Sequence, residues 1–152
     1  MEPAQPGTPA WLVMAHDARM ARLRICNLAR SAGSLSTAGG RTVATRAYVA
    51  DHVVARLVGM LGTPDPSDDE ILVLVPCAAV HGIGLRAFIG AAFVDRDGVI
   101  LRVVDPLPRR GAWCRGAHAV IEAASGVLAV EPGDRVQLGD GSIFPHGGIF
   151  PG

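Results

Sequence analysis

Apolar and polar positions alternate with a period of two along much of this chain, which is the pattern of half-buried β-strands. The segment RTVATRAYV, residues 41–49, places valine and alanine on one face and arginine and tyrosine on the other. A shorter stretch of the same kind covers residues 23–27, and a glycine- and serine-rich loop over residues 31–40 separates the two. We therefore expect these two strands to pair as a hairpin.

Two further stretches predict strands in the middle of the chain. The run ILVLV, residues 71–75, is apolar throughout, as in strands that are buried on both faces. In AAFVDRDGVILRVV, residues 91–104, two apolar runs flank Asp97 and Gly98. This dipeptide readily supplies positive φ at both central positions of a type I′ turn, so it predicts a tight β-hairpin.

The C-terminal part of the pattern is shorter and more interrupted. Residues 117–123, AHAVIEA, predict one more strand. In residues 125–138, SGVLAVEPGDRVQL, we expect a short helical turn capped by Ser125, then a Pro-Gly-Asp turn and a last strand.

One segment changes to a helical period. In DHVVARLVGMLG, residues 51–62, apolar residues recur three and four positions apart. Asp51 is a suitable N-cap and Gly62 a suitable C-cap. These signals predict one short α-helix near residues 51–61.

Together these elements predict a mainly β fold with about six to eight short strands and one short helix. We expect a compact single-domain sandwich or distorted barrel, because 152 residues suffice for one hydrophobic core. The expected boundaries are a flexible segment over residues 1–20, one domain over residues 21–139, and a flexible tail rich in glycine, proline and phenylalanine over residues 140–152.

The charge balance narrows the classes of partner. All 14 basic residues are arginine, and 14 acidic residues bring the formal net charge to zero. A neutral chain lacks the excess positive charge that holds nucleic acid or anionic membrane surfaces, so neither is an expected partner. No apolar run is long enough to insert into a membrane. Three cysteines without an export signal predict reduced thiols in a cytoplasmic protein, with one disulfide and a free thiol as the alternative. A protein partner remains open.

Four motifs follow one another in the order found in a known family. They are ARLVGMLG (55–62), VPCAAVHGIGLRAFIGAAFVDRDGVILRVV (75–104), the proline and arginine loop at 108–110, and AVIEAASGVLAVEPGDRV (119–136). Over about residues 41–138 the chain thereby resembles the bacterial and archaeal family known as domain of unknown function 192. The resemblance implies a mainly β sandwich or barrel, an association with secretion or pilus systems, and no assigned activity. Structural roles are expected for Gly59, Gly62, Gly84, Asp97, Gly98, Glu122, Gly133 and Asp134.

The chain departs from this family at its most recognisable motif. Where relatives read H-T-x-G-M-R-x-P-I-D, the positions that match are His81, Gly84, Arg86 and Ile89. The positions that differ are Gly82, Leu85, Phe88 and Gly90. An activity that depends on the acidic side chain of the family therefore lacks that group here, because glycine stands at position 90.

Cys77 and His81 are the candidate catalytic residues. A thiol beside an imidazolium and an arginine would have a lowered pKa, so the pair could act as a nucleophile and its base. A zinc site would need further ligands from Cys26, Cys114, His118 or an acidic residue elsewhere in the fold. The favoured interpretation is a buried structural thiol and a hydrogen-bonded histidine. We expect neither a metal nor a cofactor.

The central arginines predict an anion site. Arginine forks match carboxylate and phosphate groups, and the candidate ligand-binding residues are His81, Arg86, Arg109, Arg110 and Trp113. The alternative is a solvated rim in which these arginines pair with Asp95, Asp97 and Asp105. Trp113 would either cover the site or plug the core.

The leading hypothesis is a non-catalytic binding or accessory module for an anionic small molecule or an acidic peptide. The alternatives are an enzyme that uses Cys77 and His81, and an interaction module that recruits a partner through a sheet edge or the C-terminal tail.

Overall fold

The structure is a computed structural model that describes residues 29–51, 67–84 and 87–144. All regular structure in these ranges is β-strand, so the predicted mainly β class is confirmed. The strands are β1 (Arg30–Ser31), β2 (Leu35–Thr37), β3 (Thr42–Ala44), β4 (Arg46–Ala50), β5 (Glu70–Leu74), β6 (Ala79–Val80), β7 (Ile89–Val94), β8 (Ile100–Val104), β9 (Ala112–Trp113), β10 (Ala119–Ala124) and β11 (Val136–Leu138). They are shorter and more numerous than predicted, because several have only two or three residues.

The main sheet has six strands in the order β1-β4-β5-β10-β7-β8. Only β4 and β5 run parallel, and the other neighbours are antiparallel. The strands β7 and β10 lie inside the sheet, and their side chains are almost entirely buried on both faces. The predicted strands at residues 71–75 and 117–123 are confirmed as β5 and β10, each within two residues of the expected bounds.

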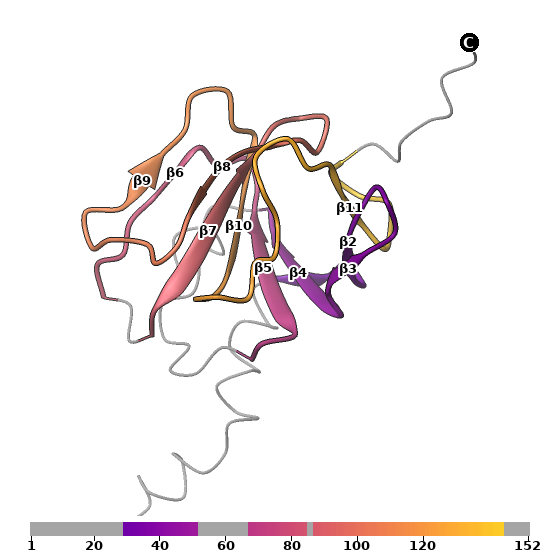
Figure 1. Cartoon of the computed structure of the whole chain (residues 1–152), viewed down its shortest axis with the longest axis horizontal. Helices are drawn as coiled ribbons and strands as arrows, with labels where there is room; N and C mark the ends of the chain where they lie inside the picture. The colour runs from indigo at the N-terminus through magenta and orange to yellow at the C-terminus, as the bar shows by residue number, and fades with distance from the viewer. Residues whose placement is uncertain (1–28, 52–66, 85–86, 145–152) are drawn as a thin grey trace, which may run out of the picture.

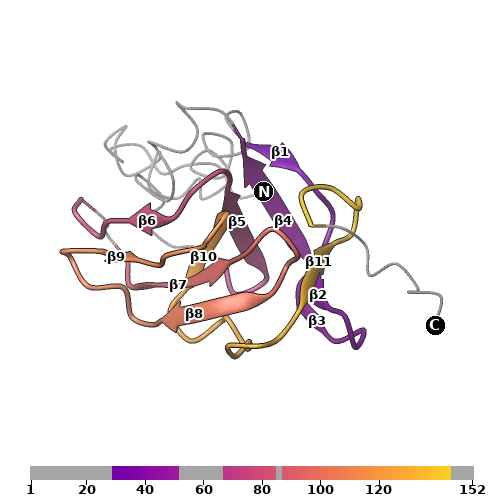
Figure 2. The same ribbon diagram turned by 90° about the horizontal axis from the view of Figure 1, so that it is seen from above.

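Two smaller sheets lie on opposite sides of the main sheet (Figure 1). The small sheet has the order β11-β2-β3, and the ribbon consists of β6 and β9 alone. Seen from above, the ribbon and the small sheet again lie far apart on either side of the central strands (Figure 2). The arrangement is a sandwich-like stack of sheets without a closed barrel, so the sandwich alternative of the prediction is the correct one.

Two hydrophobic clusters fill the two sides of the main sheet. Because side chains alternate along a strand, Ile71 and Val73 contribute to one cluster while Leu72 and Leu74 contribute to the other. The first cluster joins the main sheet to buried residues of the small sheet, such as Leu35. The second cluster includes partly buried residues of the ribbon and its flanks: Cys77, Val80, Ala112 and Cys114.

The N-terminal strands differ from the prediction. The segment 41–49, expected as one strand, divides at Thr45 into β3 and β4, which belong to different sheets. The segment 31–40, expected as a loop, contains β2 with Leu35 fully buried. The antiparallel partner of β4 is β1, whereas the strand expected over residues 23–27 lies outside the described ranges.

The β7–β8 hairpin is confirmed, but its turn is not type I′. The Gly98 amide donates to the Asp95 carbonyl at 3.2 Å, so Arg96 and Asp97 are the central residues. Positive φ is found at Gly98 (82°) and not at Asp97. The Asp95 side chain accepts the amides of Asp97 and Val99 at 2.9 Å, which favours a type I turn followed by a left-handed glycine.

Two turns follow β10. The expected helical turn at Ser125 is absent, and the Val127 amide instead closes a β-turn on the Ala124 carbonyl at 3.1 Å. The expected Pro-Gly-Asp turn is present: the Asp134 amide donates to the Glu131 carbonyl at 3.0 Å, and Gly133 has a φ of 97°. A glycine with positive φ after proline is the usual requirement of a type II turn.

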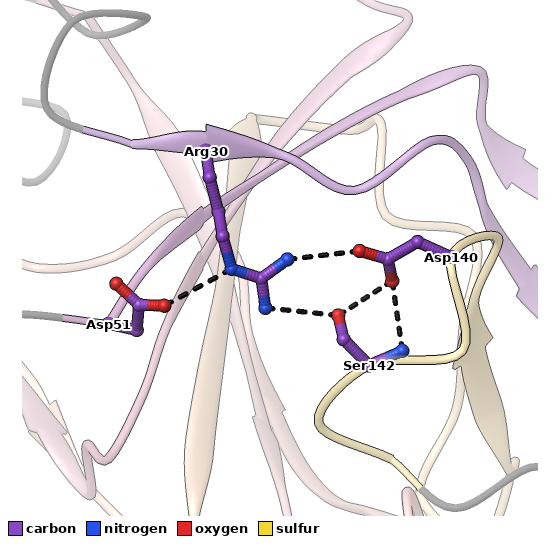
Figure 3. A network of polar contacts seen from close by, with 4 residues as sticks. All are labelled: Arg30, Asp51, Asp140 and Ser142. Atoms are coloured by element: carbon purple, nitrogen blue, oxygen red, sulfur yellow. Dashed lines mark hydrogen bonds and ion pairs between the residues drawn. The ribbon is translucent and has the colours of Figure 1, made fainter.

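A polar network ties the end of the described chain to the main sheet (Figure 3). The Arg30 guanidinium donates to Asp51 Oδ2 at 3.1 Å, to Asp140 Oδ2 at 2.9 Å and to Ser142 Oγ at 3.1 Å. Phe144, two residues after Ser142, is 1% exposed and belongs to the first cluster. Residues 140–144 are therefore part of the packed domain and not of the tail predicted over residues 140–152.

The helix predicted near residues 51–61 lies outside the described ranges apart from Asp51, and so do Gly59 and Gly62. Where the chain is described, it contains no helix that could cross a membrane.

Candidate functional site

The ribbon places one side chain of each strand outward. Ala79 lies opposite Trp113, and Val80 lies opposite Ala112. Val80 and Ala112 pack toward the second cluster, whereas Ala79 and Trp113 are exposed. Trp113 is 66% exposed, so it does not plug the core. Its small cross-strand neighbour, Ala79, leaves the indole uncovered on that side.

The loops at one end of the ribbon cross with almost no space between their backbones. A Cβ atom on Gly111 would overlap the Val80 carbonyl oxygen and approach His81 Cα to 2.8 Å. A Cβ atom on Gly82 would lie 2.7 Å from the Pro108 carbonyl oxygen. Only glycine fits such close approaches, and Gly111 also has a φ of 80°. The crossing brings the backbone of His81 beside the loop that carries the two arginines at 109 and 110.

A shallow depression of about 380 Å³ lies on the ribbon. It is lined by Ala79, Val80, Arg110, Gly111, Ala112 and Trp113. Arg102 on β8 donates from Nη1 to the Trp113 carbonyl at 2.8 Å, which ties β9 to the main sheet. A guanidinium and an exposed indole thus share one surface on a fixed backbone.

Two of the three acids expected to neutralise this surface, Asp95 and Asp105, accept hydrogen bonds from other groups. Asp105 accepts the Ser125 hydroxyl at 2.5 Å and the Gly126 amide at 2.8 Å. Asp95 accepts amides of its own turn. Within residues 29–51, 67–84 and 87–144, no ion pair joins an acid to Arg109 or Arg110. The pairing required by the solvated-rim alternative is therefore not observed in the described ranges.

The arginines of the N-terminal strands behave differently. Arg46 contacts Asp69 through two nitrogens, at 3.1 and 2.9 Å, and Glu70 through the third at 2.8 Å. The hydrogen bond from Arg46 holds the pKa of Asp69 below its usual value, and the same bond raises the pKa of Arg46. These groups clamp the first residues of the parallel strands β4 and β5.

Asp140 has a lowered pKa as well. Desolvation opposes the shift, but hydrogen bonds from the Ser142 hydroxyl and amide and from Arg30 outweigh it. The carboxylate is thus held in its ionised form by the network around Arg30.

The glycine at position 90 makes room for an acid from another strand. A Cβ atom on Gly90 would lie 2.8 Å from both Cγ and Oδ2 of Asp105. Asp105 directly follows β8, the antiparallel neighbour of β7. The space that a side chain at position 90 would occupy therefore holds the carboxylate of Asp105, which is already hydrogen-bonded to Ser125 and Gly126.

Cys77 and His81 lie on either side of β6 in an extended segment, not on one face of a helix. The Cys77 thiol is half-buried and donates to the Ala79 carbonyl at 3.2 Å, and its amide donates to the His118 carbonyl at 2.9 Å. His81 is exposed. The enzyme alternative based on this pair stays a prediction.

The structure also shows where three of the residues with predicted structural roles lie. Glu122 is 4% exposed on the side of the main sheet that faces the second cluster, between Leu72 and Ala91 on the neighbouring strands. Gly84 has a positive φ of 82°. Asp134 Oδ2 accepts the Glu131 amide at 2.9 Å. No group of three metal-ligating side chains occurs in the part of the chain that the structure describes.

The structure brings together His81, Arg109, Arg110 and Trp113 of the predicted ligand-binding set, while Arg86 lies outside the described ranges. Two exposed apolar residues, Ile83 (66%) and Phe88 (82%), are not among the predicted site residues. Two features of the sequence could have indicated their exposure. Gly84, a turn residue, follows Ile83, and Phe88 stands where the related motif has proline.

Two solved structures have a similar fold. A candidate transcription regulator from Sinorhizobium meliloti superposes with a TM-score of 0.60 at 22% identity, over 69% of this chain and 90% of its own. A protein of unknown function from Novosphingobium aromaticivorans superposes with a TM-score of 0.55 at 19% identity, over 60% of this chain and 74% of its own. No family model and no curated protein sequence match the chain. At these identities the likeness concerns the fold alone.

Proposed function

We propose that the chain is a non-catalytic binding or accessory module whose ribbon holds an anionic ligand. One observation carries the proposal: Arg110 and Trp113 line the same depression, and no acid in the described ranges pairs with Arg109 or Arg110. A guanidinium can form two parallel hydrogen bonds with a carboxylate or phosphate, and the indole supplies apolar contact area beside it. The ligand class is therefore a carboxylate- or phosphate-bearing molecule or peptide.

Other parts of the interpretation remain predictions. These are membership of the family known as domain of unknown function 192, its association with secretion or pilus systems, and a cytoplasmic location. The description of the Sinorhizobium protein as a transcription regulator belongs to that protein. A nucleic-acid surface is not part of our proposal, because this chain has a formal net charge of zero.

Isothermal titration with citrate, inorganic phosphate and oligoglutamate tests the proposal. We expect at least one of these anions to bind, with an affinity that falls as salt is added. The double variant Arg109→Gln/Arg110→Gln should weaken binding by at least about tenfold, since it removes both forks.

Arg41→Gln is the matched control, because Arg41 directly precedes β3 of the small sheet. That sheet lies across the main sheet from the ribbon (Figure 2). The Arg41→Gln variant should bind as the wild type does. Equal affinity of the wild type and the double variant for every bound anion would refute the proposal, as would the absence of any binding.

A further inference from the structure

Trp113 differs in its surroundings from the other large apolar side chains that are exposed in the described ranges. Its indole is 66% exposed and lines the depression on the ribbon together with Arg110. Ile83 and Phe88 are exposed as well, but neither lines the depression. Single exposed apolar residues are common on protein surfaces, whereas an aromatic ring and a charged group that line one depression are typical of a ligand site.

Small residues lie beside the indole. Ala79 is the direct cross-strand neighbour of Trp113, and Gly111 and Ala112 line the same depression. Cross-strand neighbours have Cβ atoms about 4.5–5.5 Å apart, so a large side chain at position 79 would pack against the indole. The methyl group of alanine covers little of it. The ribbon therefore leaves room beside Trp113 for a flat group.

The backbone at both ends of the depression is held in place. The Gly111 amide donates to the Pro108 carbonyl at 2.8 Å, which closes a tight turn directly before β9 with Arg110 as its third residue. The bond from Arg102 to the Trp113 carbonyl fixes the other end. Arg110 and Trp113 are three positions apart, so their Cα atoms are separated by at most about 11 Å. One small molecule can therefore contact both side chains.

We propose that the ligand of the ribbon carries a planar aromatic ring close to its phosphate or carboxylate group. This inference rests on the proposed function and specifies its ligand. The ring stacks on the indole of Trp113 beside Ala79, while the anionic group accepts hydrogen bonds from the Arg110 guanidinium. An anion without a ring would leave the indole uncovered.

Stacking also suits the shape of the site. Most small molecules are held in a cleft that buries most of their surface, and the depression on the ribbon is too shallow for that. A stacked ring needs contact on one of its faces only, as on the aromatic platforms that bind the bases of single-stranded nucleic acids. A ring-bearing anion therefore gains more from this surface than a compact anion such as citrate.

Isothermal titration of the full chain with two matched pairs of anions tests the inference. The pairs are adenosine monophosphate with the matching ribose phosphate, and phenylsuccinate with succinate. In at least one pair, the member with the ring should bind at least about fivefold more tightly, because stacking on an aromatic side chain contributes that much or more. A preference in one pair alone identifies the anionic group as phosphate or as carboxylate.

Variants of the ribbon locate the preference. Trp113→Ala should reduce it to less than about twofold, whereas Trp113→Phe should retain part of it because a phenyl ring still stacks. Ala79→Leu should reduce it too, since the larger side chain packs against the indole. Phe88→Ala is the matched control: this ring is 82% exposed and does not line the depression, so the preference should be unchanged. All three positions are exposed, so the variants are expected to fold.

The outcomes separate this inference from the proposed function. If both members of each pair bind with equal affinity, the ribbon takes anions but the ring inference is wrong. The ring inference is also wrong if neither Trp113→Ala nor Ala79→Leu reduces the preference, or if Phe88→Ala abolishes it. If no anion binds at all, both proposals fail.

Discussion

The arginines of this domain form two sets with opposite surroundings. In the described ranges, all five ion pairs involve Arg30, Arg41 or Arg46, which lie on or beside the N-terminal strands. None involves Arg109 or Arg110, which lie at the ribbon. The formal net charge is zero, but the charges are unevenly distributed. Acidic residues pair with the N-terminal arginines, whereas Arg109 and Arg110 are available to solvent or to a ligand.

The difference shows how the two regions are held in place. The first set joins distant segments through side chains, as Arg30 does with Asp51 and Asp140. The ribbon is instead held by backbone contacts at Gly82 and Gly111 and by the bond from Arg102 to the Trp113 carbonyl. Because its backbone supplies the attachment, the ribbon can leave its charged and aromatic side chains available for binding.

The largest expected effect concerns the region of the first set. Phe144→Ala should lower the free energy of unfolding by about 3–5 kcal/mol, because it empties a buried site in the first cluster, two residues after Ser142 of the Arg30 network. Phe88→Ala, at a position that is 82% exposed, should lower the free energy of unfolding by less than about 0.5 kcal/mol. Urea unfolding of both variants measures the contrast. Similar losses for the two would mean that Phe88 is part of the core.

A smaller effect is expected where the ribbon is attached. Gly111→Ala should lower the free energy of unfolding by roughly 2–4 kcal/mol, since it combines an overlap with the Val80 carbonyl and a strained positive φ. Gly40→Ala is the control, because Gly40 has a similar φ and open space around the added Cβ. It should lower the free energy of unfolding by about 1–2 kcal/mol. If both glycines cost the same, the close backbone crossing does not hold the ribbon.

Acid should weaken the first set selectively. The lowered pKa values of Asp69 and Asp140 mean that their contribution is complete above the usual aspartate pKa of 3.8 and is lost as the pH falls through their folded values. Thermal unfolding between neutral pH and pH values below 3.8 should therefore show a steeper loss for the wild type than for Asp69→Asn. Parallel curves for the two proteins would argue against a stabilising role of the clamp at Asp69.

The long strands of the fold could be predicted from the sequence, and the short ones could not. The segments 71–75 and 117–123 became β5 and β10 because their apolar runs are long enough to define a buried strand. The three residues of β2 are too few for a period to be visible, although Leu35 is fully buried. The break at Thr45 was also hidden, since the alternation continues through it while the strand changes sheets.

The turn after β7 had a usable signal that the Asp-Gly dipeptide obscured. The sequence D-R-D-G has aspartate at the first and glycine at the fourth position, which is the preference of a type I turn. Long-range contact adds to it, because a Cβ on Gly98 would lie 2.5 Å from the Val136 carbonyl oxygen.

The charged residues and the indole of the candidate site could be predicted from the sequence, but the exposure of other apolar residues could not. The arginines, His81 and Trp113 were identified by residue type, and the structure places them on neighbouring segments. Ile83 and Phe88 were not identified, because an apolar residue near a strand is normally counted as core and its exposure depends on the tertiary fold.

The most direct test is thermal unfolding of Arg109→Gln/Arg110→Gln with and without an oligoglutamate peptide. Without peptide, the melting temperature should stay within about 2 °C of the wild type, because these arginines lack ion pairs in the described ranges. With peptide, the wild type should melt at a higher temperature and the double variant should not. A clear fall in the melting temperature without peptide, or a rise equal to that of the wild type with it, would contradict the division between structural and ligand-binding arginines.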